Sequence, residues 1–219
     1  TEIYTLSLHD ALPISNYGNL KLGRRAFPAF FDVDGDNNLD LIVGNSAGEL
    51  RYYRRGQGTG NDQWTLESKH FLGYQGRKNS APIFADLDSD GDFDLLVGNQ
   101  EGSIDYWENK GSSGLAEFVY NPTQFIGVIG GRNTVPAVID LNGDGHNDLL
   151  TGNFNGQLRK FDRIEKGKGF YFQLERRKYL NLDVGIGSVP KIIDLNNDQQ
   201  PEMIIGSDSG KLISFQADP

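Results

Sequence analysis

Short apolar segments alternate with polar, glycine-rich turns along this chain. Residues 28–32 read PAFFD, and residues 39–45 read LDLIVGN with three consecutive aliphatic side chains. A short apolar run between turn residues is typical of a strand buried on both faces. Residues 49–55 and 63–68 follow as ELRYYRR and QWTLES. The pattern predicts four short strands, and no segment shows a helical period with capping residues.

This four-strand unit recurs with a constant step. Its acidic turn begins at Asp32, Asp86, Asp140 and Asp194, each 54 residues after the one before, so no insertion or deletion separates the copies. An aromatic position keeps the same step at Tyr53, Trp107, Phe161 and Phe215. Four strands in a repeat of about 50 residues are typical of a β-propeller, in which neighbouring blades cover one another's faces. A β-solenoid is the alternative, but its repeats are usually shorter.

We therefore expect an all-β chain: a β-propeller of four-stranded antiparallel blades over residues 16–219, with four repeats and the last blade incomplete. The final unit stops after its third strand, and the matching fourth strand would fall near residues 10–14. Residues 1–15, TEIYTLSLHDALPIS, do not fit the repeat and resemble translated sequencing-adapter read-through. We expect them to be a non-native or disordered leader, because they lack the basic start and long apolar stretch of a signal peptide. The chain is expected to be a fragment of a larger propeller, with a genuine four-bladed ring as the alternative.

The charge is concentrated in the repeated turns. The net charge is −9, and 15 of the 30 acidic residues lie in loops 32–40, 86–94, 140–148 and 194–202. This distribution argues against nucleic acid as a partner and favours cations. The chain has no cysteine, which excludes disulfides and thiolate metal sites. It also has no apolar run long enough to span a bilayer.

The acidic loops place side-chain oxygens at alternate positions of a tight turn. Counted from the first aspartate, these oxygens fall at positions 1, 3, 5 and 9, and position 7 can offer its backbone carbonyl while its side chain varies. An all-oxygen cage of this kind suits Ca²⁺, whereas Mg²⁺ requires a stricter octahedron. The candidate metal-ligating positions are Asp32, Asp34, Asp36, Asn38, Asp40, Asp86, Asp88, Asp90, Asp92, Asp94, Asp140, Asn142, Asp144, His146, Asp148, Asp194, Asn196, Asp198, Gln200 and Glu202.

Two other interpretations of these loops are possible. They are not EF-hands, because position 12 holds an apolar residue or threonine rather than glutamate. They could be ordinary polar turns, since Asp, Asn and Gly favour turns, but turn chemistry does not require an acid at position 9. The fourth loop fits least well, because Asn197 and Gln199 replace glycine and Pro201 precedes Glu202. We therefore expect up to four calcium ions, with the fourth site the weakest.

The stretch APIFADLDSDGDFDLLVGN and its three relatives resemble the FG-GAP/VCBS repeat, the blade of integrin α-subunits and of many bacterial secreted proteins. The resemblance covers residues 17–216. It implies calcium-binding propeller blades and an extracellular, cell-surface or periplasmic location. It also implies a binding or adhesion module whose ligand is an unidentified protein or glycan.

The alternative is an enzyme, because some calcium-dependent polysaccharide lyases resemble this blade type. Such a lyase needs a base near a substrate-binding calcium, yet His9, His70 and His146 occupy unrelated positions of the repeat. The sequence shows no nucleophile–base pair, phosphate loop or zinc spacing, so we expect no catalytic residues. We interpret Trp107 as blade packing and regard its neighbour Tyr106, on the opposite face, as the better candidate for a ligand contact. The basic segments RYYRR and ERRKY are more typical of exposed strand faces than of glycan sites.

Overall fold

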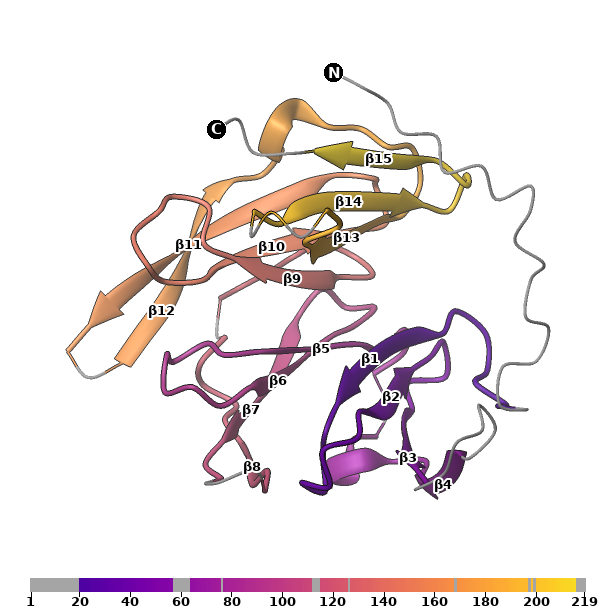
Figure 1. The fold of residues 1–219 in the computed structure, drawn as a ribbon. Helices are drawn as coiled ribbons and strands as arrows, with labels where there is room; N and C mark the ends of the chain where they lie inside the picture. The colour runs from indigo at the N-terminus through magenta and orange to yellow at the C-terminus, as the bar shows by residue number, and fades with distance from the viewer. Residues whose placement is uncertain are drawn as a thin grey trace.

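The computed structural model of the 219-residue chain describes residues 20–56, 64–75, 77–111, 115–125, 127–167, 169–196, 198 and 200–215. Four small antiparallel sheets are arranged as the blades of a β-propeller (Figure 1). Helical structure within these ranges is limited to two 3-10 turns, η3 (Phe71–Gly73) and η4 (Tyr179–Asn181). The leader expected at residues 1–15, and with it the fourth strand expected near residues 10–14, falls outside the described residues.

Each blade is one sheet whose strands follow chain order. The first blade contains β1 (Phe27–Phe31), β2 (Asp40–Gly44), β3 (Leu50–Arg55) and β4 (Trp64–Ser68). The second contains β5 (Ala81–Ala85), β6 (Asp94–Gly98), β7 (Ile104–Asn109) and β8 (Phe118–Tyr120). The third contains β9 (Val135–Ile139), β10 (Asp148–Gly152), β11 (Leu158–Lys166) and β12 (Gly169–Arg176). The fourth has three strands in the described residues, β13 (Ser188–Ile193), β14 (Glu202–Ser207) and β15 (Leu212–Phe215).

The predicted architecture is confirmed, and every predicted strand of the first unit lies within one residue of the observed bounds. The second strands β2, β6 and β10 are buried at all five positions. The aliphatic runs of β6 and β10 have no solvent side because both faces of their blades pack on a neighbouring blade, whereas Leu41 and Val43 of β2 are covered by Leu20, Leu22 and Trp64. A central strand with this sequence is therefore stable only in a stack of sheets.

Three hydrophobic clusters hold consecutive blades together. The first joins blades one and two through residues such as Leu50 and Trp107. The second joins blades two and three and contains Ile104 and Phe161, and the third joins blades three and four through Leu158 and others. Trp107 is 6% exposed in its cluster, which confirms its assignment to packing.

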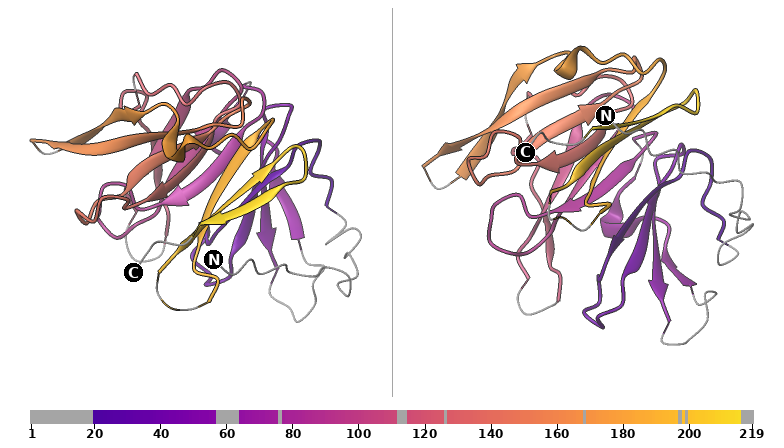
Figure 2. Two further views of the ribbon diagram at one scale, coloured as in Figure 1. Left: turned by 90° about the horizontal axis from the view of Figure 1, so that it is seen from above. Right: turned by 45° about the horizontal axis from the view of Figure 1, so that its top comes forward.

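The first strands of the blades lie side by side around the axis of the propeller (Figure 2). Asn79 and Asn133, one repeat apart, meet there through a 2.8 Å hydrogen bond from Nδ2 to Oδ1. Arg25 occupies the matching position in the first blade and forms a 3.1 Å ion pair with Asp208 of the fourth. Equivalent positions of the repeat thus converge on one narrow axis.

Glycine at the end of the second strand allows the blades to approach closely. A Cβ built on Gly98 would lie 2.3 Å from the carbonyl oxygen of Thr134 in the next blade, and Gly44 and Gly152 have equivalent contacts at 2.1 and 2.2 Å. At the matching Gly206 the nearest atom is Leu212 Cδ1 at 3.9 Å. The steric requirement for glycine therefore comes from the following blade.

We predict that Gly98→Ala destabilises the protein by about 1–3 kcal/mol, because the added methyl group displaces the neighbouring strand. Gly206→Ala, the matched control, should change the free energy of unfolding by less than about 0.5 kcal/mol. Urea denaturation of both variants measures the difference. Equal losses in the two variants would contradict the steric explanation.

Candidate metal centres

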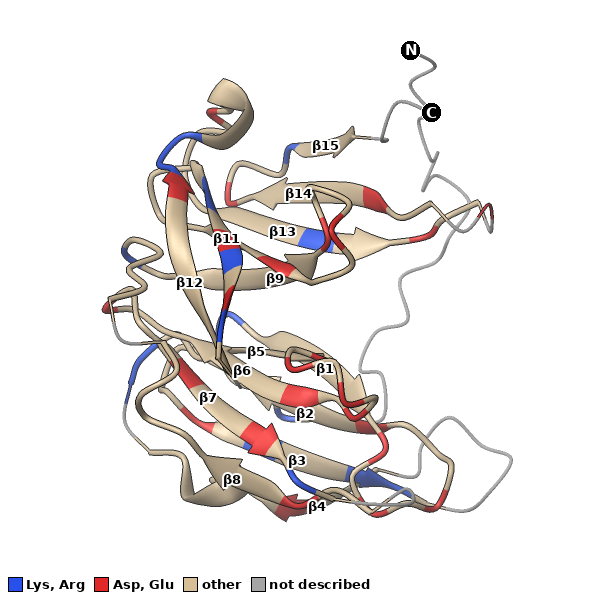
Figure 3. Ribbon diagram, turned by 90° about the vertical axis from the view of Figure 1, so that its left-hand side faces the viewer, with Lys and Arg blue, Asp and Glu red and all other residues tan. Residues whose placement is uncertain are grey.

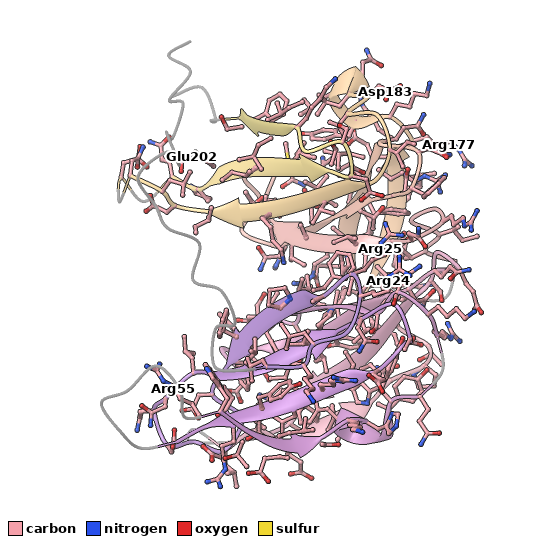
Figure 4. All side chains as sticks on the ribbon, turned by 90° about the vertical axis from the view of Figure 1, so that its right-hand side faces the viewer. Arg24, Arg25, Arg55, Arg177, Asp183 and Glu202 are labelled. Carbon is pink, nitrogen blue, oxygen red and sulfur yellow. The ribbon has the colours of Figure 1, made fainter. Side chains whose placement is uncertain are left out.

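Each acidic loop connects the first and second strands of its blade. Asp and Glu residues, red in Figure 3, mark these loops, and Figure 4 labels Glu202 where β14 begins. The loops are short because β1 and β2, and their equivalents, pair along their full length from the inner end to the loop. The alternating Asp positions are therefore held close to the ends of two paired strands.

The loop backbone wraps around the carboxylate at position 1. In the first loop Asp32 accepts hydrogen bonds from the amides of Gly35 and Asn37, both at 2.8 Å. The second and third loops repeat this arrangement at Asp86 and Asp140. Asp32 also accepts the N–H of Asp36 at 3.2 Å. Because an ionised carboxylate has about four acceptor sites, lone pairs remain free of backbone donors on each of the three carboxylates.

Position 5 has a similar role in all four loops. Its carboxylate accepts the backbone N–H of position 7 at 2.8 to 2.9 Å. The pairs are Asp36 with Asn38, Asp90 with Asp92, Asp144 with His146, and Asp198 with Gln200. The position-7 residues therefore contribute to the loop through their backbones, whatever their side chains.

The acid at position 9 is buried and links three segments of its blade. Asp94 is fully buried. Its Oδ1 accepts the N–H of Asn109 from the third strand at 2.8 Å, and its Oδ2 accepts the N–H of Leu87 at 3.1 Å. Asp40 and Asp148 make the equivalent bonds. Burial raises the pKa of Asp94 to about 7, although these donors oppose the shift.

A residue of the third strand approaches this buried acid from the side. The hydroxyl groups of Tyr52 and Tyr106 donate to Oδ2 of Asp40 and Asp94 at 3.0 Å. The suggestion that Tyr106 contacts a ligand is wrong, because its side chain is only 2% exposed. Tyr106 lies on the face of the second blade that packs on the third blade. Trp107 lies on the opposite face, which packs on the first blade.

Side-chain oxygens converge in the first two loops. The carboxylates of Asp32, Asp34 and Asp40 offer ligand atoms within 4.8 Å of one another, and so do those of Asp86, Asp88 and Asp90. Among the described residues, no Lys or Arg forms an ion pair with any of these six. Burial and then repulsion from Asp90 raise the pKa of Asp88. Such an all-oxygen, negatively charged set fits a hard divalent cation.

The other predicted positions do not join a cluster of three acidic groups in the described residues. Asn142 and Asn196 at position 3 lower the charge of the third and fourth loops. Their amide nitrogens donate to the position-5 carboxylates of Asp144 and Asp198 at 2.9 Å. In the fourth loop Glu202 accepts the N–H of Leu195 at 2.8 Å, so it replaces aspartate in the bond to the start of the loop.

Sequence reasoning missed a cross-blade brace on the second loop. Arg163 of the third blade is 6% exposed and donates to the carbonyl oxygen of Leu87 and, at 3.3 Å, to Oγ of Ser89. Its guanidinium carbon lies 4.3 Å from the ring centroid of Phe170. Asn147 of the third loop adds a 2.9 Å hydrogen bond to the carbonyl oxygen of Asp86. The equivalents of Arg163 are Arg55 and Asn109, so the repeat itself gave no signal for this contact.

A family model of the FG-GAP-like repeat matches two overlapping segments, residues 32–97 and 86–151, which together cover more than half of the 219 residues. The chain belongs to the FG-GAP-like repeat family. Each FG-GAP-like segment runs from one acidic loop to the second strand of the next blade, so the first three loops lie within the match. A comparison with curated proteins found no match. No helix in the described ranges is both long enough and apolar enough to cross a membrane.

We predict that Arg163→Met lowers the free energy of unfolding by about 1–3 kcal/mol, because it leaves the buried carbonyl oxygen of Leu87 without its donor. Arg55→Met is the matched control, since Arg55 occupies the same phase but is exposed. Thermal and urea denaturation test the pair. An equal loss of free energy of unfolding in both variants would show that the contacts of Arg163 with the second loop do not stabilise the protein.

Proposed function

We propose that this FG-GAP-like chain is a calcium-stabilised propeller that acts as an extracellular or cell-surface binding module for a protein or glycan. The observation that supports the proposal is the convergence of three carboxylates in each of the first two loops. Two unit charges about 4 Å apart interact with roughly 4 kcal/mol at an effective dielectric of 20. A bound cation would convert this repulsion into attraction.

The residues present fit calcium better than other common cations. All candidate ligand atoms in the first two loops are oxygen, and no cysteine occurs in the chain. When bound, Ca²⁺ would supply a positive charge and 6 to 8 coordination positions at roughly 2.3–2.6 Å. Asp32, Asp34 and Asp40 would hold it in the first loop, and Asp86, Asp88 and Asp90 in the second.

The four loops should differ in affinity, because their charges differ. The first and second loops contain four and five acidic residues, whereas the third and fourth contain three each. Fewer carboxylates attract a divalent ion less strongly, and asparagine occupies position 3 in both of the weaker loops. The proposal therefore includes two stronger sites and two weaker ones.

We predict that calcium raises the melting temperature and that chelation reverses the effect. At 100 times its dissociation constant, calcium stabilises the folded state by about 2.7 kcal/mol per site. The double variant Asp34→Asn and Asp88→Asn gives the first two loops the asparagine found in the third, so its response should be much smaller. Glu117→Gln removes an exposed acid outside the loops and is the control.

Isothermal titration calorimetry and thermal unfolding, each with Ca²⁺ and Mg²⁺, measure these effects. An unchanged melting temperature and no heat of binding in the wild-type protein would refute the calcium sites. An equal response in the double variant and the wild-type protein would place the ions elsewhere.

The binding role follows from the rigid blades and from the family. Calcium would fix the loops at one edge of the sheets and leave the connections between strands available for contacts. An exported location fits this role, because calcium outside the cell reaches millimolar levels that fill moderate sites. Catalysis would need a base close to such a site. His146 lies in the third loop, one of the two weaker proposed sites, and its Nδ1 is 4.0 Å from Glu165.

We predict calcium-dependent binding without turnover. The protein should retain a glycan or protein on an array in calcium and lose it when a chelator is added. Acidic polysaccharides incubated with the protein should give no increase in the ultraviolet absorbance of unsaturated sugars. Appearance of that product would show a lyase instead. Binding that persists after the chelator is added would show that ligand recognition does not require the metal.

A further inference from the structure

One position of the repeat carries a different chemical group in the third blade. This position lies in the third strand and holds Tyr52, Tyr106 and Lys160 in the first three blades. In the first two blades the tyrosine hydroxyl donates a 3.0 Å hydrogen bond to the buried acid at position 9 of the acidic loop. In the third blade a positively charged ammonium group replaces that hydroxyl group.

Lys160 reaches the position-9 acid of its own blade. Strand pairing places Leu150 of β10 beside Lys160 of β11, and Asp148, two residues before Leu150, lies on the same face of the sheet. The Nζ atom of Lys160 lies 3.7 Å from Oδ2 of Asp148, which is fully buried. Among the described residues, Asp148 is the one position-9 acid that forms an ion pair with a lysine or arginine.

The surroundings of Lys160 hold its ammonium group in place. Its Nζ atom lies 2.7 Å from Oδ1 of Asp162 and 3.1 Å from Oε2 of Glu175. Lys160 is 7% exposed, and a lysine is rarely buried to this extent unless carboxylates pair with it. Three carboxylates therefore fix one ammonium group beside the third acidic loop.

The two acids beside Lys160 are combined in the third blade but not in the first or second. In the first blade the same two positions hold Arg54 and Glu67, which pair with each other at 2.9 Å. In the second blade Asn121 stands at the position of Glu175. Two acids at these positions repel each other unless a cation lies between them, and Lys160 supplies that cation.

We propose that Lys160 is a built-in cation that takes the role of calcium in the third blade and lowers the affinity of the third loop for the ion. This inference rests on the proposed calcium function of the first two loops. An ion bound to Asp148 would share that carboxylate with the ammonium group, and like charges repel each other more strongly in a buried site than in water. The third blade is then stable without calcium, whereas the first two blades depend on it.

The low charge of the third loop is the competing explanation for weak binding, because Asn142 stands where Asp34 and Asp88 stand in the first two loops. The two explanations predict different variants. Lys160→Met removes the ammonium group and leaves the loop unchanged, whereas Asn142→Asp adds a carboxylate and leaves Lys160 in place. We expect Lys160→Met to create a stronger site and Asn142→Asp alone to have a small effect.

Isothermal titration calorimetry with Ca²⁺ alone tests the proposal in the double variant Asp34→Asn and Asp88→Asn, whose first two loops are weakened. Addition of Lys160→Met should raise the calcium affinity of the third loop by at least about tenfold. The melting temperature should fall in chelator, because three carboxylates lose their partner, and should recover in calcium. Lys166→Met changes an exposed lysine of the same strand and is the matched control, with both quantities unchanged.

Hydrogen exchange of the wild-type protein gives a second test that needs no variant. The amides of Gly91 and Gly145 occupy the same position of the second and third loops and donate to Asp86 and Asp140 at 3.1 and 2.9 Å. At a calcium concentration that saturates the first two loops, exchange should slow at Gly91 and stay unchanged at Gly145. Lys160→Tyr, which restores the residue of the first two blades, replaces Lys160→Met in the calorimetry if the methionine variant does not fold.

Three results would overturn the inference and leave the proposed function intact. The first is calcium binding by the first two loops of the wild-type protein with no gain in affinity in Lys160→Met. The second is a stronger site in Asn142→Asp but not in Lys160→Met, which would assign the weak binding to the charge of the loop. The third is equal protection of Gly91 and Gly145 by calcium.

The proposed function can also fail separately from this inference. Calcium binding by the Lys160→Met variant, but not by the first two loops of the wild-type protein, would refute the proposed function of those loops and support the role of Lys160. Absence of binding in both proteins would overturn both proposals.

Discussion

The packing of one sheet face on another is the constraint on which this structure depends. A blade has apolar side chains on both faces, and its second strand is buried at every position, so a single blade cannot exist in water without neighbours. The distance between blades is set by glycines such as Gly98, where even a methyl group would collide with the next strand. The alignment of the loops and the narrow axis both follow from this repeated contact.

The buried acid at position 9 connects this packing to the candidate metal centres. Asp94 is a predicted ligand, but it also accepts hydrogen bonds from two residues of the third strand, Tyr106 and Asn109, and from the start of its own loop. Burying a carboxylate is unfavourable unless donors surround it. Three donors meet that requirement here, and they fix the loop to the rigid core of the blade. The loop geometry is therefore established by the protein before any ion is considered.

The fold could be predicted closely because four copies of one pattern reinforce each other. A single run such as LDLIVGN is ambiguous, but its return every 54 residues with conserved phase identifies a blade. The oxygen-bearing positions of the loops can also be predicted from the sequence, because residues that are neighbours along a tight turn are also close in space. The structure places Asp32, Asp34 and Asp40 together as expected.

The failures have a common physical origin. Alternation along the strand predicts that Tyr106 lies on the face opposite Trp107, and one face of an antiparallel sheet is often exposed to solvent. In a propeller both faces are interior, so alternation does not separate buried from exposed positions. Arg163 was missed because its partners, Leu87 and Ser89, lie in another blade more than 70 residues away. A contact between two blades depends on how the blades are aligned with each other. The sequence of either segment alone therefore does not predict it.

The one-sided packing of the fourth blade also has a consequence for local unfolding. In a stack of sheets, a unit that packs on one neighbour gains interface energy from one side, whereas a unit between two neighbours gains it from both sides. The amides of β14 should therefore exchange with solvent through smaller openings than those of β6, although the two strands have similar sequences. Local opening would begin in a blade that packs on one neighbour and spread to blades that pack on two, so the amides of β6 would keep their protection longer than those of β14.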